Sequence, residues 1–333
     1  MKNILQTFIL GNSSISLISL IVVLIYFTKY QSRTSLIQQN EQIRPRGVFV
    51  ILIRSTNRSV FLTINMIHSV IHFYPTSSGS LYPFIIFHDE AFTSAMRQQI
   101  LSCVLRTNKQ IQISFALVNF QTSVKPNNKS RLEKSIGYRL MCRFWIYDVF
   151  YHPIIRQGNY DYLMRMDDDS YFSNVITEDL FLYLNRRNLD YIYRSIYLEP
   201  FDPMHPILRR FIKKKTLSRY CIYNNFFVIR LKWYYESEQI KSFVHELIQD
   251  DLILREYIGD GCIHSAMLEI DKQVKVEHVT YVSYGHNLHV MPLGYVEVFF
   301  HVVNALHDEM NKSCQQLIVL QGIEGKVTRI EMS

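Results

Sequence analysis

The pattern of apolar and polar stretches along the chain predicts alternating strands and helices. Compact apolar runs of strand length are separated by segments with apolar residues at helical spacing. The expected strands are 48–53, 82–87, 110–118 and 160–166. The expected helices are 60–73, 93–104, 135–151 and 177–187, with Thr177 as the N-cap of the last. This alternation predicts an α/β domain with a mainly parallel sheet covered on both faces.

The first part of the chain has a different character. Residues 8–27 contain no charged side chain, and at about 1.5 Å per residue they would cover about 30 Å, one bilayer core. We therefore expect a short cytoplasmic tail over 1–7, a transmembrane signal-anchor over 8–28 and a polar stem over 29–46. A cleaved signal peptide is the alternative, but the apolar stretch is long for one and lacks a small-residue cleavage site. Residues 47–333 are then expected to form one domain.

Composition and charge exclude several classes of protein. With 48% hydrophobic and 20% charged residues among 333, the chain is neither collagen-like nor wholly disordered. The formal charge of 36 − 29 = +7 suits an anionic ligand or surrounding. Because no stripe of basic residues interleaved with aromatics is present, we expect no nucleic-acid partner.

Sequons and cysteines favour a lumenal location for the domain. Glycosylation sequons begin at Asn57, Asn128 and Asn311. The five cysteines are scattered and form no CxxC pair, which argues against zinc and allows up to two disulfides in an oxidising lumen. Five reduced cysteines in a cytosolic domain remain the alternative.

Three adjacent carboxylates follow the expected strand 160–166. In a partly buried site Asp167, Asp168 and Asp169 would raise one another's pKa unless a cation neutralised them. Mg²⁺ or Mn²⁺ takes oxygen ligands and bridges to a diphosphate, and Asp167 and Asp169 point the same way if strand geometry persists. The motif predicts a divalent-metal site for the diphosphate of a nucleotide sugar. A solvated acidic turn is the plain alternative.

The residues around this motif resemble the Golgi α-1,2-mannosyltransferases of glycosyltransferase family 15, which are type II membrane enzymes of fungal type. The most specific block runs from Tyr138 to Asp169. The segments that carry the resemblance are 82–92, 137–144, 151–153, 160–169, 259–265 and 282–286. The resemblance implies a GT-A fold, a Golgi membrane location, Mn²⁺ as metal, GDP-mannose as donor, a glycan or glycoprotein as acceptor, and retention of the anomeric configuration.

Site residues are carried over from the family by position. Asp167 takes the place of a metal-binding Glu, Asp168 and Asp169 complete that acidic motif, and His286 falls on a metal-ligand His. An imidazole completing a carboxylate shell for Mn²⁺ is chemically reasonable. A hydrogen-bonded loop histidine is the alternative. Tyr138 matches a tyrosine at the donor and catalytic centre, although an ordinary buried tyrosine would also fit.

Further candidates rest on weaker grounds. Arg54 follows the first expected strand and is expected near the nucleotide. Arg143 either contacts the diphosphate or pairs with an acid. Asp260 is a candidate for contact with an acceptor hydroxyl.

The chain departs from the family at the proposed nucleophile. The family has a Glu in W-S-N-F-E-I, whereas residues 223–228 here read Y-N-N-F-F-V and contain no carboxylate. A double displacement needs a carboxylate under the anomeric carbon. Three hypotheses remain: a front-face mechanism, substitution by another acid such as Asp260, Glu256 or Glu236, or lost or altered catalysis.

The sequence therefore predicts a metal-dependent retaining glycosyltransferase, with α-1,2-mannosyl transfer from GDP-mannose as the leading interpretation. An acidic motif of this form also resembles that of UDP-sugar transferases, so a UDP-sugar donor is an alternative. A glycan-binding protein that kept the fold without catalysis is another, since the nucleophile is missing.

Overall fold

The computed structural model describes the main part of the domain and leaves the N-terminal region aside. The described residues are 44–75, 80–127, 134–198, 206–212, 220–256, 258–286, 289–291, 316–321 and 327–332. The expected tail, anchor and stem over 1–46 lie almost wholly outside these ranges, so the anchor over 8–28 stays a prediction. In the part of the chain that the structure describes, no helix has both the length and the apolar character needed to cross a bilayer.

A seven-stranded mixed sheet forms the centre of the fold, with the strand order β10-β6-β9-β4-β1-β2-β3. Its strands are β1 (Gly47–Leu52), β2 (Phe84–His88), β3 (Ile113–Leu117), β4 (Tyr162–Met166), β6 (Tyr191–Tyr193), β9 (Phe226–Arg230) and β10 (Val276–His278). β1 pairs in parallel with β2 and β4, and β2 with β3. β9 lies antiparallel between β4 and β6. The prediction of a mainly parallel sheet is confirmed, with β9 as an insertion that the sequence pattern did not reveal.

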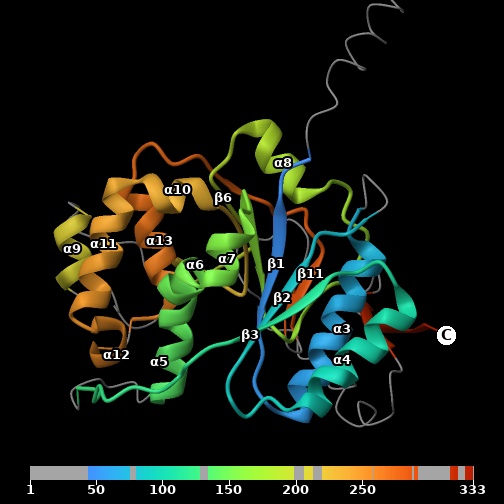
Figure 1. Ribbon diagram of the computed structural model, residues 1–333. Helices are drawn as coiled ribbons and strands as arrows, with labels where there is room; N and C mark the ends of the chain where they lie inside the picture. The colour runs from blue at the N-terminus through green and yellow to red at the C-terminus, as the bar shows by residue number, and fades with distance from the viewer. Residues whose placement is uncertain are drawn as a thin grey trace, which may run out of the picture. The chain divides into compact units, whose positions relative to one another are not determined.

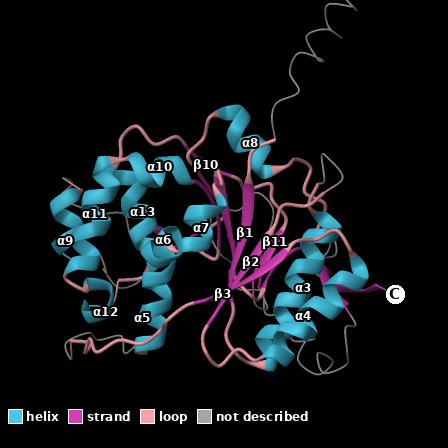
Figure 2. Ribbon diagram, in the orientation of Figure 1, coloured by secondary structure: helices cyan, strands magenta, loops and turns pink. Residues whose placement is uncertain are grey.

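Helices cover both faces of this sheet, as Figures 1 and 2 show. On one side lie α3 (Asn57–Phe73) and α4 (Ser94–Thr107), with α8 (Leu180–Arg187) near the start of β1. The helices of the other side are α5 (Ile136–Arg143), α6 (Val149–Tyr151), α7 (Pro153–Gly158), α9 (Pro206–Phe211), α10 (Leu231–Glu236), α11 (Glu238–Gln249), α12 (Leu252–Glu256) and α13 (Asp260–Ile270).

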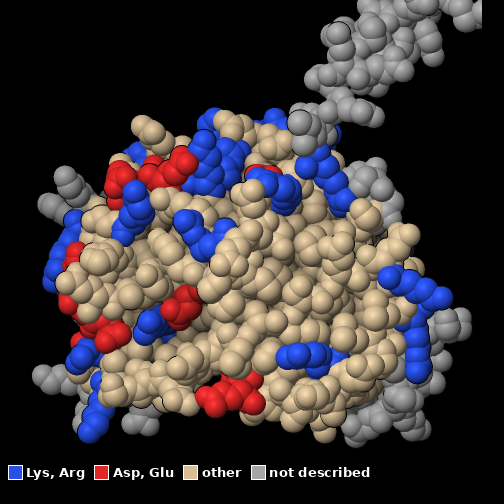
Figure 3. All heavy atoms as spheres, in the orientation of Figure 1, with Lys and Arg blue, Asp and Glu red and all other residues tan. Residues whose placement is uncertain are grey.

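Alternating side chains of the strands feed two cores. Phe49 and Ile51 of β1 pack on the side of α3, whereas Val48 and Val50 pack on the side of α5, and all four are fully buried. This two-sided burial is why the strand reads as one continuous apolar run. On the face shown in Figure 3, charged side chains lie mainly toward the margins and both signs are interspersed.

Two predicted helices differ in detail from those observed. The helix expected over 135–151 is interrupted by a π-helical turn, η1 (Phe144–Asp148), between α5 and α6. The helix expected from Thr177 begins at Leu180 instead. Asp179 is its N-cap, because its carboxylate accepts hydrogen bonds from the backbone N–H groups at 181 and 182.

Smaller sheets and a disulfide complete the fold. β5 (Ser170–Phe172), β11 (Tyr284–His286) and β12 (His289–Met291) form one small sheet. Two further strand pairs are β7 (Ile196–Leu198) with β8 (Tyr220–Ile222), and β13 (Gln316–Gln321) with β14 (Val327–Met332). A disulfide joins Cys221 on β8 to Cys262 on α13, and Cys142 is a buried free thiol.

Candidate active site

A cavity of about 950 Å³ opens at the carboxyl ends of the central parallel strands. Arg54 follows β1, Asp89 follows β2 and the acidic motif follows β4, so this is the edge at which open α/β sheets bind ligands. The remaining polar residues of its lining are Lys134, Ser135, Tyr138, Arg165, Tyr197, Tyr223, Asn224, Asn225, Asp260 and His286.

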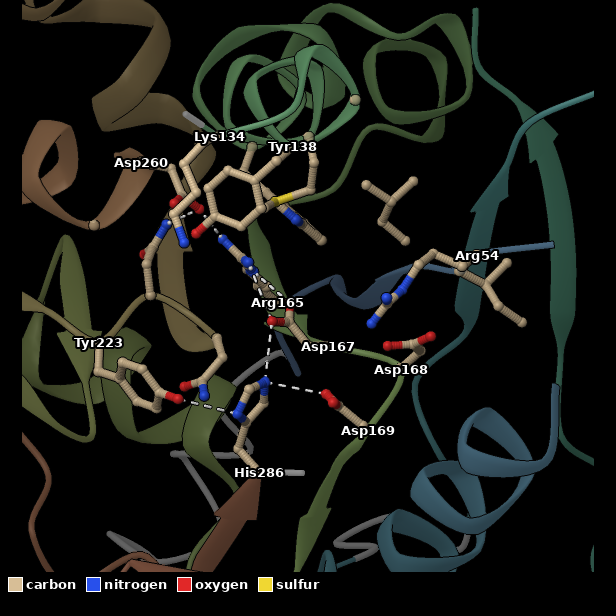
Figure 4. Close-up of a pocket in the computed structure, with 18 of the residues that line it drawn as sticks. Arg54, Lys134, Tyr138, Arg165, Asp167, Asp168, Asp169, Tyr223, Asp260 and His286 are labelled. Atoms are coloured by element: carbon tan, nitrogen blue, oxygen red, sulfur yellow. Dashed lines mark hydrogen bonds and ion pairs between the residues drawn. The ribbon is translucent and has the colours of Figure 1, made fainter. Parts of the chain in front are cut away.

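Asp167, Asp169 and His286 converge in this cavity (Figure 4). The chain turns directly after β4, with the Ser170 N–H donating to the Asp167 carbonyl oxygen at 3.0 Å, and then enters β5. β11 pairs with β5 so that His286 lies opposite Ser170. The imidazole Nε2 thereby lies 3.0 Å from Asp169 Oδ1 and 3.5 Å from Asp167 Oδ2. One ligand atom from each of the three residues falls within 4.8 Å of the others.

The charges of this cluster show what it would hold. Burial by itself would lower the pKa of the His286 imidazole, but hydrogen bonds from it to both aspartates raise that pKa to about 9. Burial works against ionisation of Asp167, yet Arg165 and His286 hold its pKa below the usual range. The Nδ1 atom of His286 lies 3.2 Å from the Tyr223 hydroxyl, which fixes the ring. The two carboxylates thus hold a positively charged imidazole, and they could hold a cation in the same way once that proton is lost.

Asp168 has a separate environment. Figure 4 shows its carboxylate turned away from His286 and toward the guanidinium of Arg54. Burial, reinforced by the charge of Asp169, raises the pKa of Asp168 to about 7. Its Oδ2 atom is buried and has no hydrogen-bond partner among the described residues. Asp168 therefore sits between the metal cluster and the β1 end of the cavity without joining the cluster.

Arg165 links the metal cluster to the far wall of the cavity. This β4 residue is 3% exposed and stacks on the Trp145 ring, with its guanidinium carbon 4.2 Å from the ring centroid. Its Nε donates to Asp167 Oδ1 at 2.8 Å and its Nη1 donates to Asp260 Oδ2 at 2.6 Å. Burial alone would lower its pKa, but the two carboxylates raise it, so the guanidinium stays charged.

Asp260 and Tyr138 form that far wall. Asp260 is the first residue of α13, is 7% exposed, and also accepts a hydrogen bond from Asn224 Nδ2 at 3.1 Å. Tyr138 lies in the first turn of α5, where Ser135 caps the helix by accepting the Tyr138 N–H at 3.3 Å. The Tyr138 ring is 38% exposed to the cavity, and the Lys134 ammonium lies 5.0 Å from its centroid. Figure 4 shows Tyr138 and Asp260 on the same side of the cavity.

Two predicted site residues lie elsewhere. Arg143 does not line the cavity and pairs with Asp148 at 3.5 Å and Asp251 at 3.7 Å, so the ion-pair alternative is the one observed. Glu256 does not line it either, and its carboxylate accepts a hydrogen bond from Asn127. The assignments of Arg143 to donor binding and of Glu256 to catalysis are therefore not supported by this geometry.

The segment 223–228, which carries no carboxylate, places a buried aromatic ring in the core. Phe227 is fully buried and stacks on Tyr191 with ring centroids 5.4 Å apart. Five carboxylates line the cavity, namely Asp89, Asp167, Asp168, Asp169 and Asp260. Asp89 accepts a hydrogen bond from Ser55 at 2.5 Å, at the β1 end. Among the described residues, Asp260 is therefore the cavity carboxylate on the wall opposite the metal cluster.

Sequence reasoning missed some residues of the site. Arg165 carries a signal that could have found it, because a charged residue inside an apolar strand indicates a buried ion pair. Tyr223, Asn224 and Asn225 carry no such signal. No signal in the sequence alone placed them next to His286 and Asp260.

Comparisons with known proteins agree with this fold. No family model matches the chain. A stretch of 124 residues is 26% identical to O-glycoside alpha-1,2-mannosyltransferase homolog 5 of Schizosaccharomyces pombe, covering 34% of this chain and 28% of that protein. The matched stretch thus spans less than a third of that relative's length.

Solved structures of mannosyltransferases share the fold over most of the chain. Core-mannan synthase A (CmsA/Ktr4) from Aspergillus fumigatus, in its Mn/GDP form, superposes with a TM-score of 0.61 at 17% identity, covering 80% of this chain and 81% of that one. The mannosyltransferase Ktr4p from S. cerevisiae gives 0.62 at 17% identity, covering 81% and 80%. The expected GT-A-type α/β fold is confirmed. The sequence match over 124 residues agrees with the resemblance read from the motifs.

Proposed function

We propose that this chain is a metal-dependent mannosyltransferase that moves mannose from GDP-mannose to a glycan or glycoprotein acceptor. The observation that carries the proposal is the convergence of Asp167, Asp169 and His286 in a cavity at the carboxyl edge of the sheet. Similar folds support it, because core-mannan synthase A is known in an Mn/GDP form and Ktr4p in complex with GDP. An α-1,2 linkage and a Golgi membrane location belong to the proposal as the forms that the resemblance implies.

The donor set fits a hard divalent cation. Two carboxylates and one imidazole offer oxygen and nitrogen ligands, and no thiolate lies among them. When bound there, Mn²⁺ would offset the charge that develops on a leaving diphosphate. Asp167, Asp169 and His286 would hold it, and Tyr223 would keep the imidazole oriented through Nδ1.

The protein's own groups then define where the rest of the substrate lies. Arg54, an exposed residue after β1, lies beside the buried Asp168 and can meet the nucleotide. Asp260, held by Arg165 and Asn224, faces the space on the far side of the metal cluster and suits an acceptor hydroxyl. In the transfer, the acceptor oxygen bonds to the anomeric carbon, the bond from that carbon to the diphosphate oxygen breaks, and GDP leaves.

Among the described residues, the chemistry of segment 223–228 and the engagement of Asp260 favour a front-face route. Phe227 offers no nucleophile, and Asp260 is engaged by two nitrogen donors. In a front-face transfer the leaving diphosphate takes the acceptor proton, so no covalent enzyme intermediate is required. A front-face transfer retains the anomeric configuration without the carboxylate nucleophile that a double displacement needs, and it therefore agrees with the residues of this cavity.

A donor panel tests the proposal. The full chain is incubated with GDP- and UDP-sugars and Mn²⁺, and transfer or hydrolysis is followed by nucleotide release. GDP-mannose turnover that is lost on chelation and in Asp169→Ala, but kept in the surface control Glu238→Ala, is the expected result. Preference for a UDP-sugar would show that the donor is a UDP-sugar and not GDP-mannose. The absence of both turnover and metal-dependent GDP binding would reject the proposed function.

A non-catalytic role is the second candidate, and Phe227 is the observation that favours it. A protein of this kind would bind Mn²⁺ and GDP without turnover. In that case Asp169→Ala would abolish nucleotide binding but leave the protein's cellular role intact. Turnover of any donor by the purified chain would exclude it.

A further inference from the structure

The side chain of Asn225 is buried without a hydrogen-bond partner. It is 5% exposed, and neither its amide nitrogen nor its amide oxygen has a partner among the described residues. A buried amide usually satisfies both atoms, and leaving them unpaired costs about 1–3 kcal/mol per group. Asn225 is also one of the residues that line the cavity, so a ligand that fills this space would lie beside it.

The backbone fixes where this amide lies. The Asp167 N–H donates to the Asn225 carbonyl oxygen at 3.3 Å, so residue 225 adjoins the metal cluster. The preceding side chain, Asn224, donates to Asp260 on the opposite wall. The dipeptide therefore runs between the cluster proposed to hold the diphosphate and the carboxylate proposed to meet the acceptor. In a nucleotide sugar, the group that lies between the diphosphate and the acceptor is the transferred sugar.

We infer that the Asn225 amide binds hydroxyl groups of the transferred sugar. An amide carries both a donor and an acceptor, so it can bind a hydroxyl in either sense. This inference rests on the proposed function, because it needs the diphosphate at the metal cluster. Asn225 is thus a sugar-positioning residue in a site whose segment 223–228 carries no carboxylate.

The matched control is a second buried polar atom that faces no ligand. The Tyr171 hydroxyl on β5 also has no partner among the described residues, but Tyr171 does not line the cavity. Its ring packs over Gly285, where an added Cβ would lie 2.3 Å from Tyr171 Cζ. Removing this hydroxyl should leave ligand binding unchanged.

The experiment compares GDP with GDP-mannose. Binding of each to the full chain with Mn²⁺ is measured for the wild type, Asn225→Ala, Asn225→Ser and Tyr171→Phe, together with the melting temperature of the ligand-free protein. We expect Asn225→Ala to weaken GDP-mannose about tenfold and GDP less than twofold. Its ligand-free melting temperature should not fall, since the wild-type side chain makes no described hydrogen bond, and Tyr171→Phe should bind both ligands normally.

Distinct results would overturn the inference. Equal weakening of GDP and GDP-mannose, or no weakening of either, would show that the amide does not touch the sugar. A lower melting temperature in both Asn225 variants would show a structural role. If wild-type protein bound neither ligand with Mn²⁺, the proposed function would fail and the inference with it, whereas normal GDP binding with an unaltered sugar preference in Asn225→Ala would reject the inference alone.

Discussion

Mn²⁺ should compete with a proton for His286. In the metal-free protein the imidazole lies between Asp169 and Asp167, which raise its pKa to about 9 against the burial that would lower it. A metal ligand must be the neutral imidazole. Binding of Mn²⁺ near pH 7 must therefore expel the proton that the two carboxylates hold.

The size of this effect on Mn²⁺ affinity follows from the difference between the pKa of His286 and the pH of the assay. At pH 7 the gap of about two units corresponds to about 3 kcal/mol, since one unit is about 1.4 kcal/mol. Mn²⁺ affinity should rise about tenfold per pH unit between about pH 6.5 and 8.5 and level off above about pH 9. The stability of the metal-free protein should depend on pH in the opposite direction. Its raised His286 pKa stabilises the fold below the ordinary value near 6.5, and that contribution is lost as the pH rises through about 9.

Calorimetry in buffers with different ionisation enthalpies measures this directly. At pH 7 we expect release of about one proton per Mn²⁺ bound. Above about pH 8, where Asp168 with its pKa of about 7 is already ionised, the pH slope of affinity should disappear in His286→Gln, while His245→Gln, on the exposed surface of α11, should keep it. Mn²⁺ binding without proton release, or a pH slope that persists in His286→Gln, would refute the reasoning.

Three further substitutions test the surrounding structure. Replacing Arg165 by Met should destabilise the protein by about 3–5 kcal/mol in urea unfolding, because it leaves buried carboxylates without their counter-charge, and a loss below about 1 kcal/mol would contradict the account. Phe227→Glu should lower stability by several kcal/mol and gain no activity, because the new carboxylate would lie against Tyr191; faster turnover would show that the site tolerates a nucleophile there. Cys221→Ser should cost about 4 kcal/mol in thermal unfolding, given the 41-residue separation from Cys262, and a loss below about 1 kcal/mol would contradict the account.

The sequence was sufficient for the parts of the fold that depend on local pattern. The strand over 48–53 and the acidic motif after β4 were located correctly because a buried strand reads as a continuous apolar run and its end is marked by a change to charge. His286 required the family resemblance, since a lone histidine more than 100 residues away has no local pattern that pairs it with Asp169. Its place follows from the pairing of β11 with β5.

Periodicity located helices but did not show which face turns to the cavity. Tyr138 and Arg143 lie on the same helix, and five residues at 3.6 per turn place their side chains about 140° apart around its axis. Tyr138 therefore lines the cavity while Arg143 pairs with Asp148 and Asp251 outside it. The antiparallel insertion of β9 could not be predicted either, because the pattern of apolar residues does not indicate the direction of a strand.

The guanidinium of Arg165 is shared between Asp167 and Asp260. Replacing either carboxylate changes the hydrogen bonding available to the other, because both accept hydrogen bonds from this one guanidinium. Kinetic losses from the two single substitutions should then fail to sum in the double variant. The rate lost in a single variant therefore cannot be assigned to one carboxylate alone. A mutant cycle that includes Arg165 is needed to separate the contributions of Asp167 and Asp260.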